Sequence, residues 1–178
     1  MVLCAAPAQA AFVMTMQQVG NDVVASGSGS ISDNSFGLSL SVLPTVRSAV
    51  GWLVTGDRSG GTTIRGGVSG PASFGTGNVR VAPSSTTGVA LGIFGNNGDF
   101  LLADSYVMGT PMTSGATWAN ATFASLGLTP GTYVWTWNTN SYTLNIIEPT
   151  PPTAVPAPPA LALFGLGLAG LLAARRRG

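Results

Sequence analysis

The sequence has no histidine and a single cysteine, Cys4. Imidazole and thiolate groups are the usual ligands of zinc and of haem iron, so their scarcity excludes the common zinc and haem sites. One cysteine also excludes a disulfide within the chain. Without histidine, a serine nucleophile lacks its usual general base, which excludes the Ser-His-Asp mechanism. We expect no cofactor and no metal site.

Charge is also scarce, because only 7% of the 178 residues are charged. Three of the seven basic residues, Arg175, Arg176 and Arg177, stand together at the C-terminal end. The other four are scattered through the chain: Arg47, Arg58, Arg65 and Arg80. Nucleic-acid binding draws on clustered Lys and Arg, so no nucleic-acid partner is expected. The length predicts one domain with tails.

The N-terminal residues end in the small-x-small pattern that signal peptidase recognises, Ala8-Gln9-Ala10, which makes Ala11 the first mature residue. A complete signal peptide has a basic start and about 7–15 apolar residues before this pattern. Residues 1–10 carry no basic residue and only a short apolar stretch. We therefore expect a signal-peptide remnant whose start lies upstream. The alternative is an alanine-rich disordered terminus.

The C-terminal region divides into a proline-rich linker and an apolar run. Six of the twelve residues from 148 to 159 are proline, which predicts a stiff polyproline II spacer. Residues 160–174 are an uninterrupted apolar and glycine stretch, followed by the three arginines. As a helix this stretch spans about 22 Å, less than the roughly 30 Å of a bilayer core. The positive-inside rule places the arginines in the cytoplasm and the preceding chain outside.

One motif inside the apolar run is misleading. Residues 165–170 match G-x-G-x-x-G letter for letter. A dinucleotide site needs a βα unit around these glycines and an acid about 20 residues later. Only eight residues follow the motif, and a nucleotide cofactor is therefore excluded here.

The region from 11 to 147 is predicted to be a single all-β domain, a β-sandwich or a jelly-roll-like fold. Short β-rich runs alternate with Gly, Ser, Asn and Pro, and no long stretch has the 3.6-residue period of a helix. The expected strands cover residues 12–19, 22–30, 37–42, 49–55, 62–68, 89–94, 100–103, 117–123, 131–138 and 142–147.

The last two of these strands are predicted to form a hairpin, because the four turn-forming residues 138–141 stand where the chain passes from one to the other. The stretch from Leu128 to Gly131, L-T-P-G, is typical of a type II turn with Gly131 at positive φ. Alternation then places Tyr133, Trp135 and Trp137 on one face of the following strand. Such a face is expected to be core, with Trp137 the side chain most open to solvent. All three aromatic residues remain candidates for contact with a sugar ring.

The acidic residues offer little for catalysis. A glycosidase needs two carboxylates that flank one bond, and Asp99 with Asp104 is the only nearby pair. The stretch from Gly95 to Asp99 carries oxygen ligands without the spacing of a calcium loop, so it is predicted to be a hairpin turn. We expect a protein that is not an enzyme.

The C-terminal region resembles a known signal. Val155, Pro156, Ala157 and Pro158, then the apolar run, then the three arginines are similar to the PEP-CTERM sorting signal of Gram-negative bacteria. Ala157 stands where that signal usually has a central Glu. The stretches 10–31 and 121–138 also resemble the opening and closing stretches of many such cargo proteins.

This resemblance implies an exported protein that its tail holds transiently in the inner membrane. An exosortase would then remove the tail and pass the body to the cell surface or matrix. On this basis we expect a non-enzymatic structural or adhesive protein. The alternative is a carbohydrate-binding module, or a weak glycan hydrolase, associated with exopolysaccharide.

Overall fold

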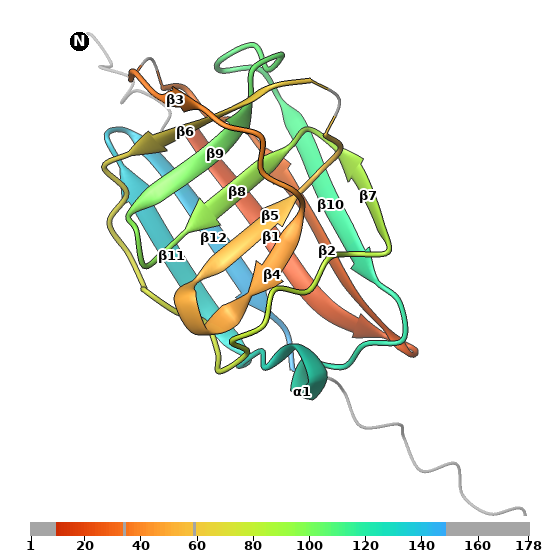
Figure 1. Cartoon of the computed structure of the whole chain (residues 1–178). Coiled ribbons are helices and arrows are strands. Elements are labelled where there is room, and N and C mark those ends of the chain that lie inside the picture. Colours follow the sequence, from red (N-terminus) through yellow and green to blue (C-terminus); the bar gives the residue numbers. More distant parts are fainter. Residues whose placement is uncertain (1–9, 34, 59, 149–178) are drawn as a thin grey trace, which may run out of the picture.

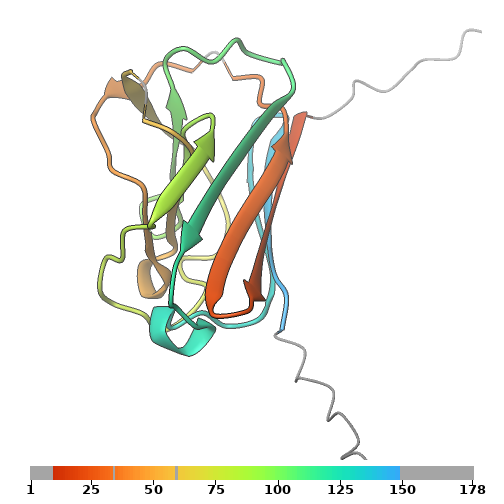
Figure 2. The same ribbon diagram turned by 90° about the vertical axis from the view of Figure 1, so that its right-hand side faces the viewer.

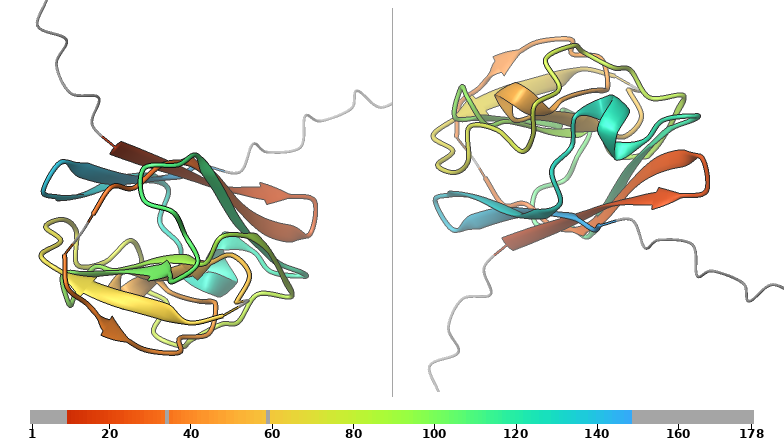
Figure 3. Two further views of the ribbon diagram at one scale, coloured as in Figure 1. Left: turned by 90° about the horizontal axis from the view of Figure 1, so that it is seen from above. Right: turned by 90° about the horizontal axis from the view of Figure 1, so that it is seen from below.

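The computed structural model describes residues 10–33, 35–58 and 60–148. Two β-sheets of six strands each pack face to face as a β-sandwich (Figure 1). Seen from above and below, the sheets form two separate layers (Figure 3). The predicted all-β fold is therefore confirmed.

The first sheet is built around the first and last strands of the domain. Its strands, in spatial order, are β11 (Gly131–Trp137), β12 (Asn140–Ile146), β1 (Ala10–Val19), β2 (Asp22–Gly29), β10 (Met112–Trp118) and β7 (Ser85–Gly88). β1 and β12 run parallel, with Ala10 opposite Asn140 and Met16 opposite Ile146. Because they are parallel, β1 begins at one end of the sandwich and β12 finishes at the other (Figure 2).

The second sheet is antiparallel throughout. Its strands, in spatial order, are β3 (Leu38–Ser39), β6 (Thr62–Gly66), β9 (Asp99–Ala103), β8 (Leu91–Phe94), β5 (Trp52–Thr55) and β4 (Thr45–Arg47). The turn between β8 and β9 is closed by the amides of Asn97 and Gly98, which both donate to the Phe94 carbonyl at 3.0 Å. This confirms the predicted hairpin turn.

The main core lies between the sheets. Phe12, Met14 and Met16 point inward from β1 and are fully buried, while Val13 between them is 44% exposed. Ile93 and Phe100 meet this layer from the second sheet, in the same apolar cluster. Each large apolar side chain buried this way contributes about 1.5–3 kcal/mol. The period-2 alternation along β1 thus determines which face of the first sheet packs against the second sheet.

The predicted C-terminal hairpin is present: β11 starts at residue 131 as predicted, and β12 starts at Asn140, two residues earlier than predicted. Trp137 pairs with Asn140 across the two-residue turn Asn138–Thr139. Asn138 takes a φ of 47°, a left-handed conformation that asparagine tolerates. Gly131 has the predicted positive φ, but the predicted type II turn is wrong, because this φ is 155° where that turn needs about +80°. Gly131 is already extended and paired in β11.

The predicted strand 117–123 is confirmed only at residues 117 and 118, and residues 112–116 of β10 were not predicted to form a strand. β10 ends at Trp118, and a single helical turn, α1 (Phe123–Leu126), follows. Its start is a capping box: the Ser125 amide donates to Thr122 Oγ1 at 3.0 Å, and the Thr122 amide donates to Ser125 Oγ at 2.8 Å. These reciprocal hydrogen bonds outweigh the β-propensity of Thr122 and Phe123.

Three further departures are small. The strand expected from residue 49 begins at Trp52, because a 3-10 helix, η1 (Ser48–Val50), precedes it. β4 and β7 were not predicted. β4 is only three residues long, and β7 contains only Ser, Thr and Gly, so neither has the apolar alternation that marks a strand.

The outer face of the first sheet has almost no charge. Thr15 of β1 stands between Asn145 of β12 and Ser26 of β2, and the next row combines the hydroxyl groups of Ser28 and Thr143 with the exposed side chains of Val13 and Val134. In the described strands of this sheet, Asp22 beside the β1–β2 turn is the one charged side chain in the outward-facing register. This face therefore offers mainly uncharged hydrogen-bonding groups, together with a few exposed valines.

The terminal segments lie outside the described residues. These are the signal-peptide remnant before Ala10, the linker after Glu148 and the expected helix over 160–178. Among the residues that are described, no helix combines the length and the hydropathy that a membrane span requires.

Candidate functional site: a cavity on the outer face of the second sheet

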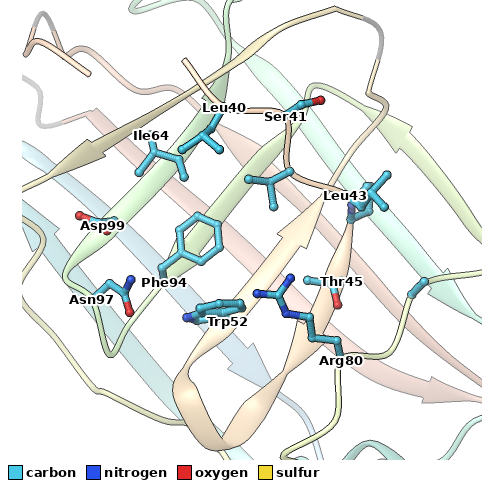
Figure 4. Close-up of a pocket in the computed structure, with 13 residues that line it drawn as sticks. Leu40, Ser41, Leu43, Thr45, Trp52, Ile64, Arg80, Phe94, Asn97 and Asp99 are labelled. Atoms are coloured by element: carbon cyan, nitrogen blue, oxygen red, sulfur yellow. The ribbon is translucent and has the colours of Figure 1, made fainter. Parts of the chain in front are cut away.

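A cavity of about 490 Å³ opens on the outer face of the second sheet, the face turned away from the first sheet (Figure 4). Along β5, Leu53 joins the main core while Val54 joins a second apolar cluster on this outer face. Phe94 and Leu101 belong to the same outer cluster. The volume falls within the roughly 300–1,000 Å³ of small-molecule sites.

The floor of the cavity is aromatic. Trp52 of β5 and Phe94 of β8 are directly opposite each other in neighbouring strands. Their rings meet edge to face, with centroids 5.3 Å apart and an interplanar angle of 90°. Ile64 of β6 continues the floor, and Leu40 and Leu43 form a wall that is 44% and 64% exposed, respectively.

Trp52 is held in one orientation by polar neighbours. Its indole Nε1 donates to Asn96 Oδ1 at 2.6 Å. The guanidinium carbon of Arg80 lies 4.3 Å from the ring centroid, and that of Arg47 lies 5.8 Å from it. Each cation–π contact of this kind contributes about 0.5–1 kcal/mol at an exposed site. Trp52 is thus a fixed platform beneath a guanidinium group.

The two arginines differ in what their N–H groups contact. Arg47 donates from Nε to the Asn78 carbonyl at 2.9 Å and from Nη2 to Asn78 Oδ1 at 2.7 Å. Arg80 is exposed, and within the described ranges its guanidinium has no hydrogen-bond or ion-pair partner. Arg80 therefore keeps its donors available to a ligand.

The opposite rim carries an amide and a carboxylate. Asn97 lies in the β8–β9 turn, and Asp99 begins β9. Figure 4 shows both on the far side of Phe94 from Arg80. Burial raises the pKa of the Asp99 carboxyl above its ordinary value. The cavity thus has a cation at one end, hydrogen-bonding oxygens at the other, and an apolar floor between them.

These groups suit noncovalent binding of a small polar ligand. An apolar floor with a few convergent polar groups is the usual composition of a binding pocket. In the part of the chain that the structure describes, no group of three or more Cys, Asp or Glu side chains could hold a metal ion.

The aromatic face predicted from the sequence is real, but it is buried. Trp135 is 1% exposed and Trp137 is 4% exposed, while Tyr133 is half-buried. Trp137 stacks on Phe100 of the other sheet, with centroids 4.5 Å apart. The expectation that Trp137 is the most open of the three is wrong, because this face of β11 packs into the core between the sheets.

The indole nitrogens of these residues also point into the protein. Trp135 Nε1 donates to the Pro71 carbonyl at 2.8 Å, and Trp137 Nε1 is buried without a partner among the described residues. The Tyr133 hydroxyl donates to the Thr129 carbonyl at 3.0 Å. A sugar ring has no access to the faces of Trp135 and Trp137.

The aromatic residue that sequence reasoning missed is Trp52. It was expected only as part of an ordinary strand. One signal could have identified it: Trp52-Leu53-Val54 is a continuous apolar run, which is typical of a strand with apolar neighbours on both faces. A strand buried on both faces needs a second layer on its outer side, and that layer here forms the cavity wall.

The carboxylate pair proposed for hydrolysis does not form a pair. Asp99 and Asp104 lie five positions apart at the two ends of β9, which is about 17 Å at roughly 3.3 Å per residue. A glycosidase holds its two carboxyl groups about 5–9.5 Å apart. Asp104 instead accepts a hydrogen bond from Thr63 Oγ1 at 2.5 Å. These two residues cannot flank one glycosidic bond.

Of the two residues expected to mark signal cleavage, Ala10 is described and Ala8 is not. Ala10 is the first residue of β1, and the Ala11 carbonyl accepts the Ser30 amide at 3.0 Å. The expected mature N-terminus therefore coincides with the start of the sheet. The sorting-signal residues all lie outside the described ranges: Val155, Pro156, Ala157, Pro158, Arg175, Arg176 and Arg177.

Comparison with known proteins identifies the tail. A family model for the PEP-CTERM protein-sorting motif matches residues 154–177, which include both the proline box and the three arginines. No curated protein matches the chain. No solved structure matches it either. The motif implies processing by an exosortase, a membrane protease, with export through the membrane to the cell surface. The chain is therefore an exported protein that carries a PEP-CTERM sorting motif at residues 154–177.

Proposed function

We propose that the β-sandwich is a non-enzymatic structural or adhesive component of the cell surface or extracellular matrix of a Gram-negative bacterium. The sorting motif at residues 154–177 carries this proposal, because it joins a removable membrane tail to a separate folded body. The body would remain at the surface once the tail has been cut.

The use of the acidic residues supports a non-enzymatic role. Asp22 accepts the Asn120 amide at 2.9 Å, Asp33 accepts Ser35 Oγ at 2.7 Å, and Asp57 accepts Thr86 Oγ1 at 2.8 Å. Together with Asp104, these carboxylates close turns and tie loops to strands. Groups bound in this way stabilise the fold.

The outer face of the first sheet supports an adhesive role. Its Ser, Thr and Asn side chains, described above, present hydroxyl and amide groups over six adjacent strands. Contacts through such a face do not depend on charge and should persist at high ionic strength.

Fractionation with intact-mass spectrometry tests the delivery step. We expect full-length protein in the inner membrane, and protein without residues 175–177 and most of the apolar run at the surface or in the matrix. Deletion of the exosortase gene should leave only the full-length form. Full-length mass on surface material would contradict the proposal.

A second candidate function is carbohydrate binding, and the cavity beside Trp52 favours it. The cavity combines an aromatic floor with guanidinium, amide and carboxylate groups at its rim. We propose exopolysaccharide as the partner. Affinity electrophoresis in gels that contain polysaccharide tests this: retardation should occur for the wild-type protein and weaken in Trp52→Ala, with circular dichroism to show that the variant is folded. Equal mobility of the two proteins in every gel would contradict it.

A further inference from the structure

We propose that the cavity beside Trp52 binds an acidic sugar, meaning a pyranose ring that carries a carboxylate, within a polysaccharide chain. This inference rests on the carbohydrate-binding function proposed above and specifies its ligand class. Arg80 binds the carboxylate, and the floor of the cavity contacts the sugar ring. The side chains of Asn97 and Asp99 contact the hydroxyl groups of the sugar.

The position of Arg80 is the first reason. Its guanidinium carbon is 4.3 Å from the centroid of Trp52, so one face of the planar group rests on an aromatic surface. Stacking leaves the N–H groups at its edges free, and these match a carboxylate in a two-point hydrogen-bonded arrangement. Trp52 is itself fixed through Asn96. The guanidinium is thus positioned before the ligand arrives.

The electrostatic surroundings of Arg80 are the second reason. Arg47 adds a second cation 5.8 Å from the same indole centroid. Of the acidic side chains in the described ranges, Asp99 is the one that lines the cavity, and it lies at the opposite rim. The end of the cavity at Arg80 is therefore positive and unneutralised, which favours an anionic group there.

The floor is the third reason. The partly exposed side chain of Ile64 offers an apolar surface beyond Trp52, and only the small exposed part of Phe94, which is 5% exposed, adds to it. One face of a pyranose ring exposes mainly C–H groups, so it can lie on such a surface without losing hydrogen bonds to its hydroxyls. The ring of the ligand then occupies the space between Arg80 and the opposite rim.

The far rim is the fourth reason. The Asn97 side chain can both donate and accept hydrogen bonds, and Asp99 accepts them. Adjacent hydroxyl groups of a sugar need this combination. The Asp99 carboxylate would repel the carboxylate of the ligand, so it also determines the orientation in which the ligand binds.

This cavity is less suited to binding a peptide than to binding a sugar. Peptides often bind by adding a strand to a free sheet edge. β5 and β8 are inner strands whose neighbours on both sides are already paired, so a peptide cannot add to them here. Peptide binding is kept as an outcome of the test.

Isothermal titration of the folded protein tests the proposal with matched ligands. The probes are oligosaccharides of polygalacturonate and of alginate, and the same oligosaccharides after chemical reduction of their carboxyl groups to alcohols. We expect binding to at least one acidic probe, and at least about ten-fold weaker binding to its reduced form, since a charged hydrogen-bonded pair is lost.

Variants locate the effect in the cavity. Arg80→Gln should weaken binding of the acidic probe at least about ten-fold. Arg80→Lys keeps the charge but loses the planar two-point geometry, and it should lose most of the affinity as well. Val107→Thr, at an exposed position between β9 and β10 that does not line the cavity, is the control and should bind like the wild type. Circular dichroism and the melting temperature should show that all variants are folded.

Each other outcome overturns the inference in a distinguishable way. Equal binding of acidic and reduced probes overturns the acidic specificity and leaves carbohydrate binding in place. Binding of the acidic probe that Arg80→Gln does not change shows general attraction of an anion, and it overturns the site. Equal competition by a short peptide with a free C-terminal carboxylate overturns the sugar as ligand. No binding of any probe overturns both carbohydrate binding and this inference, while the mass-spectrometry test of delivery is unaffected.

Discussion

Trp137 of β11 lies flat on Phe100 of β9, with ring centroids 4.5 Å apart and an interplanar angle of 26°. The two residues come from opposite sheets, and they are 4% and 0% exposed, respectively. This contact therefore joins the sheets across the core.

Replacing Trp137 should accordingly cost stability. We expect Trp137→Ala to lower the free energy of unfolding by about 3–5 kcal/mol, as for other buried aromatic residues. Trp137→Phe keeps a stacked ring and removes the unpartnered indole N–H, so it should cost much less. Urea unfolding followed by circular dichroism measures both. A loss below about 1 kcal/mol in Trp137→Ala would show that the contact does not hold the sheets together.

The Asp99 carboxyl should produce a pH-dependent stability. Burial raises its pKa in the folded state. The folded state therefore favours the protonated form, and this contribution is present below the unfolded pKa of about 3.9 and is lost as pH rises through the folded value. We expect Asp99→Asn to gain stability relative to the wild type between pH 3 and pH 7. Urea midpoints at several pH values measure this, and a constant difference across that range would contradict it.

Tyr142 should make the protein sensitive to alkali. Its side chain is fully buried next to Phe12, and burial raises the pKa of its phenol. Stability from this group is complete below the unfolded pKa of about 10 and falls above it, by about 1.4 kcal/mol per pH unit. Tyr142→Phe should remove that loss between pH 10 and pH 11. If the variant and the wild type lose stability equally over this interval, another group is responsible.

Changes in the tail should separate recognition from membrane insertion. Replacing Pro156 and Pro158 removes the box before the apolar run and should leave uncut precursor in the inner membrane. Replacing Arg175, Arg176 and Arg177 by neutral residues removes the orienting charges and should reduce correct processing. Immunoblots of membrane and surface fractions distinguish the two results. Normal release of the double proline variant would show that the box is not recognised.

The mature N-terminus should be Ala11. Signal cleavage after Ala10 would leave a chain whose first residue already belongs to β1. N-terminal sequencing of the secreted form measures this. Retention of residues 1–10 would argue for the alanine-rich terminus in place of a signal peptide.

Several elements were predictable because their signals are local. The strand predicted over residues 12–19 is confirmed by β1, and the structure shows that Phe12, Met14 and Met16 lie on its buried face. The hairpin around Asn138 was predictable from its turn residues, as was the turn at Gly98. α1 was missed because its capping box depends on hydrogen bonds that outweigh the β-propensity of the same residues.

The destination of the protein was encoded in the sequence alone, because a sorting signal is a linear pattern of prolines, apolar residues and arginines that a membrane enzyme recognises without the fold. The all-β fold was determined in the same way, by alternation and turn residues. The candidate site was not determined by the sequence alone. Trp52, Arg80 and Asp99 are distant in the sequence, and only sheet pairing brings β5 beside β8 and places Arg80 over the indole. The exposure of each aromatic residue was likewise decided by the packing of the two sheets, which buries Trp137 against Phe100 and leaves Trp52 at the surface cavity.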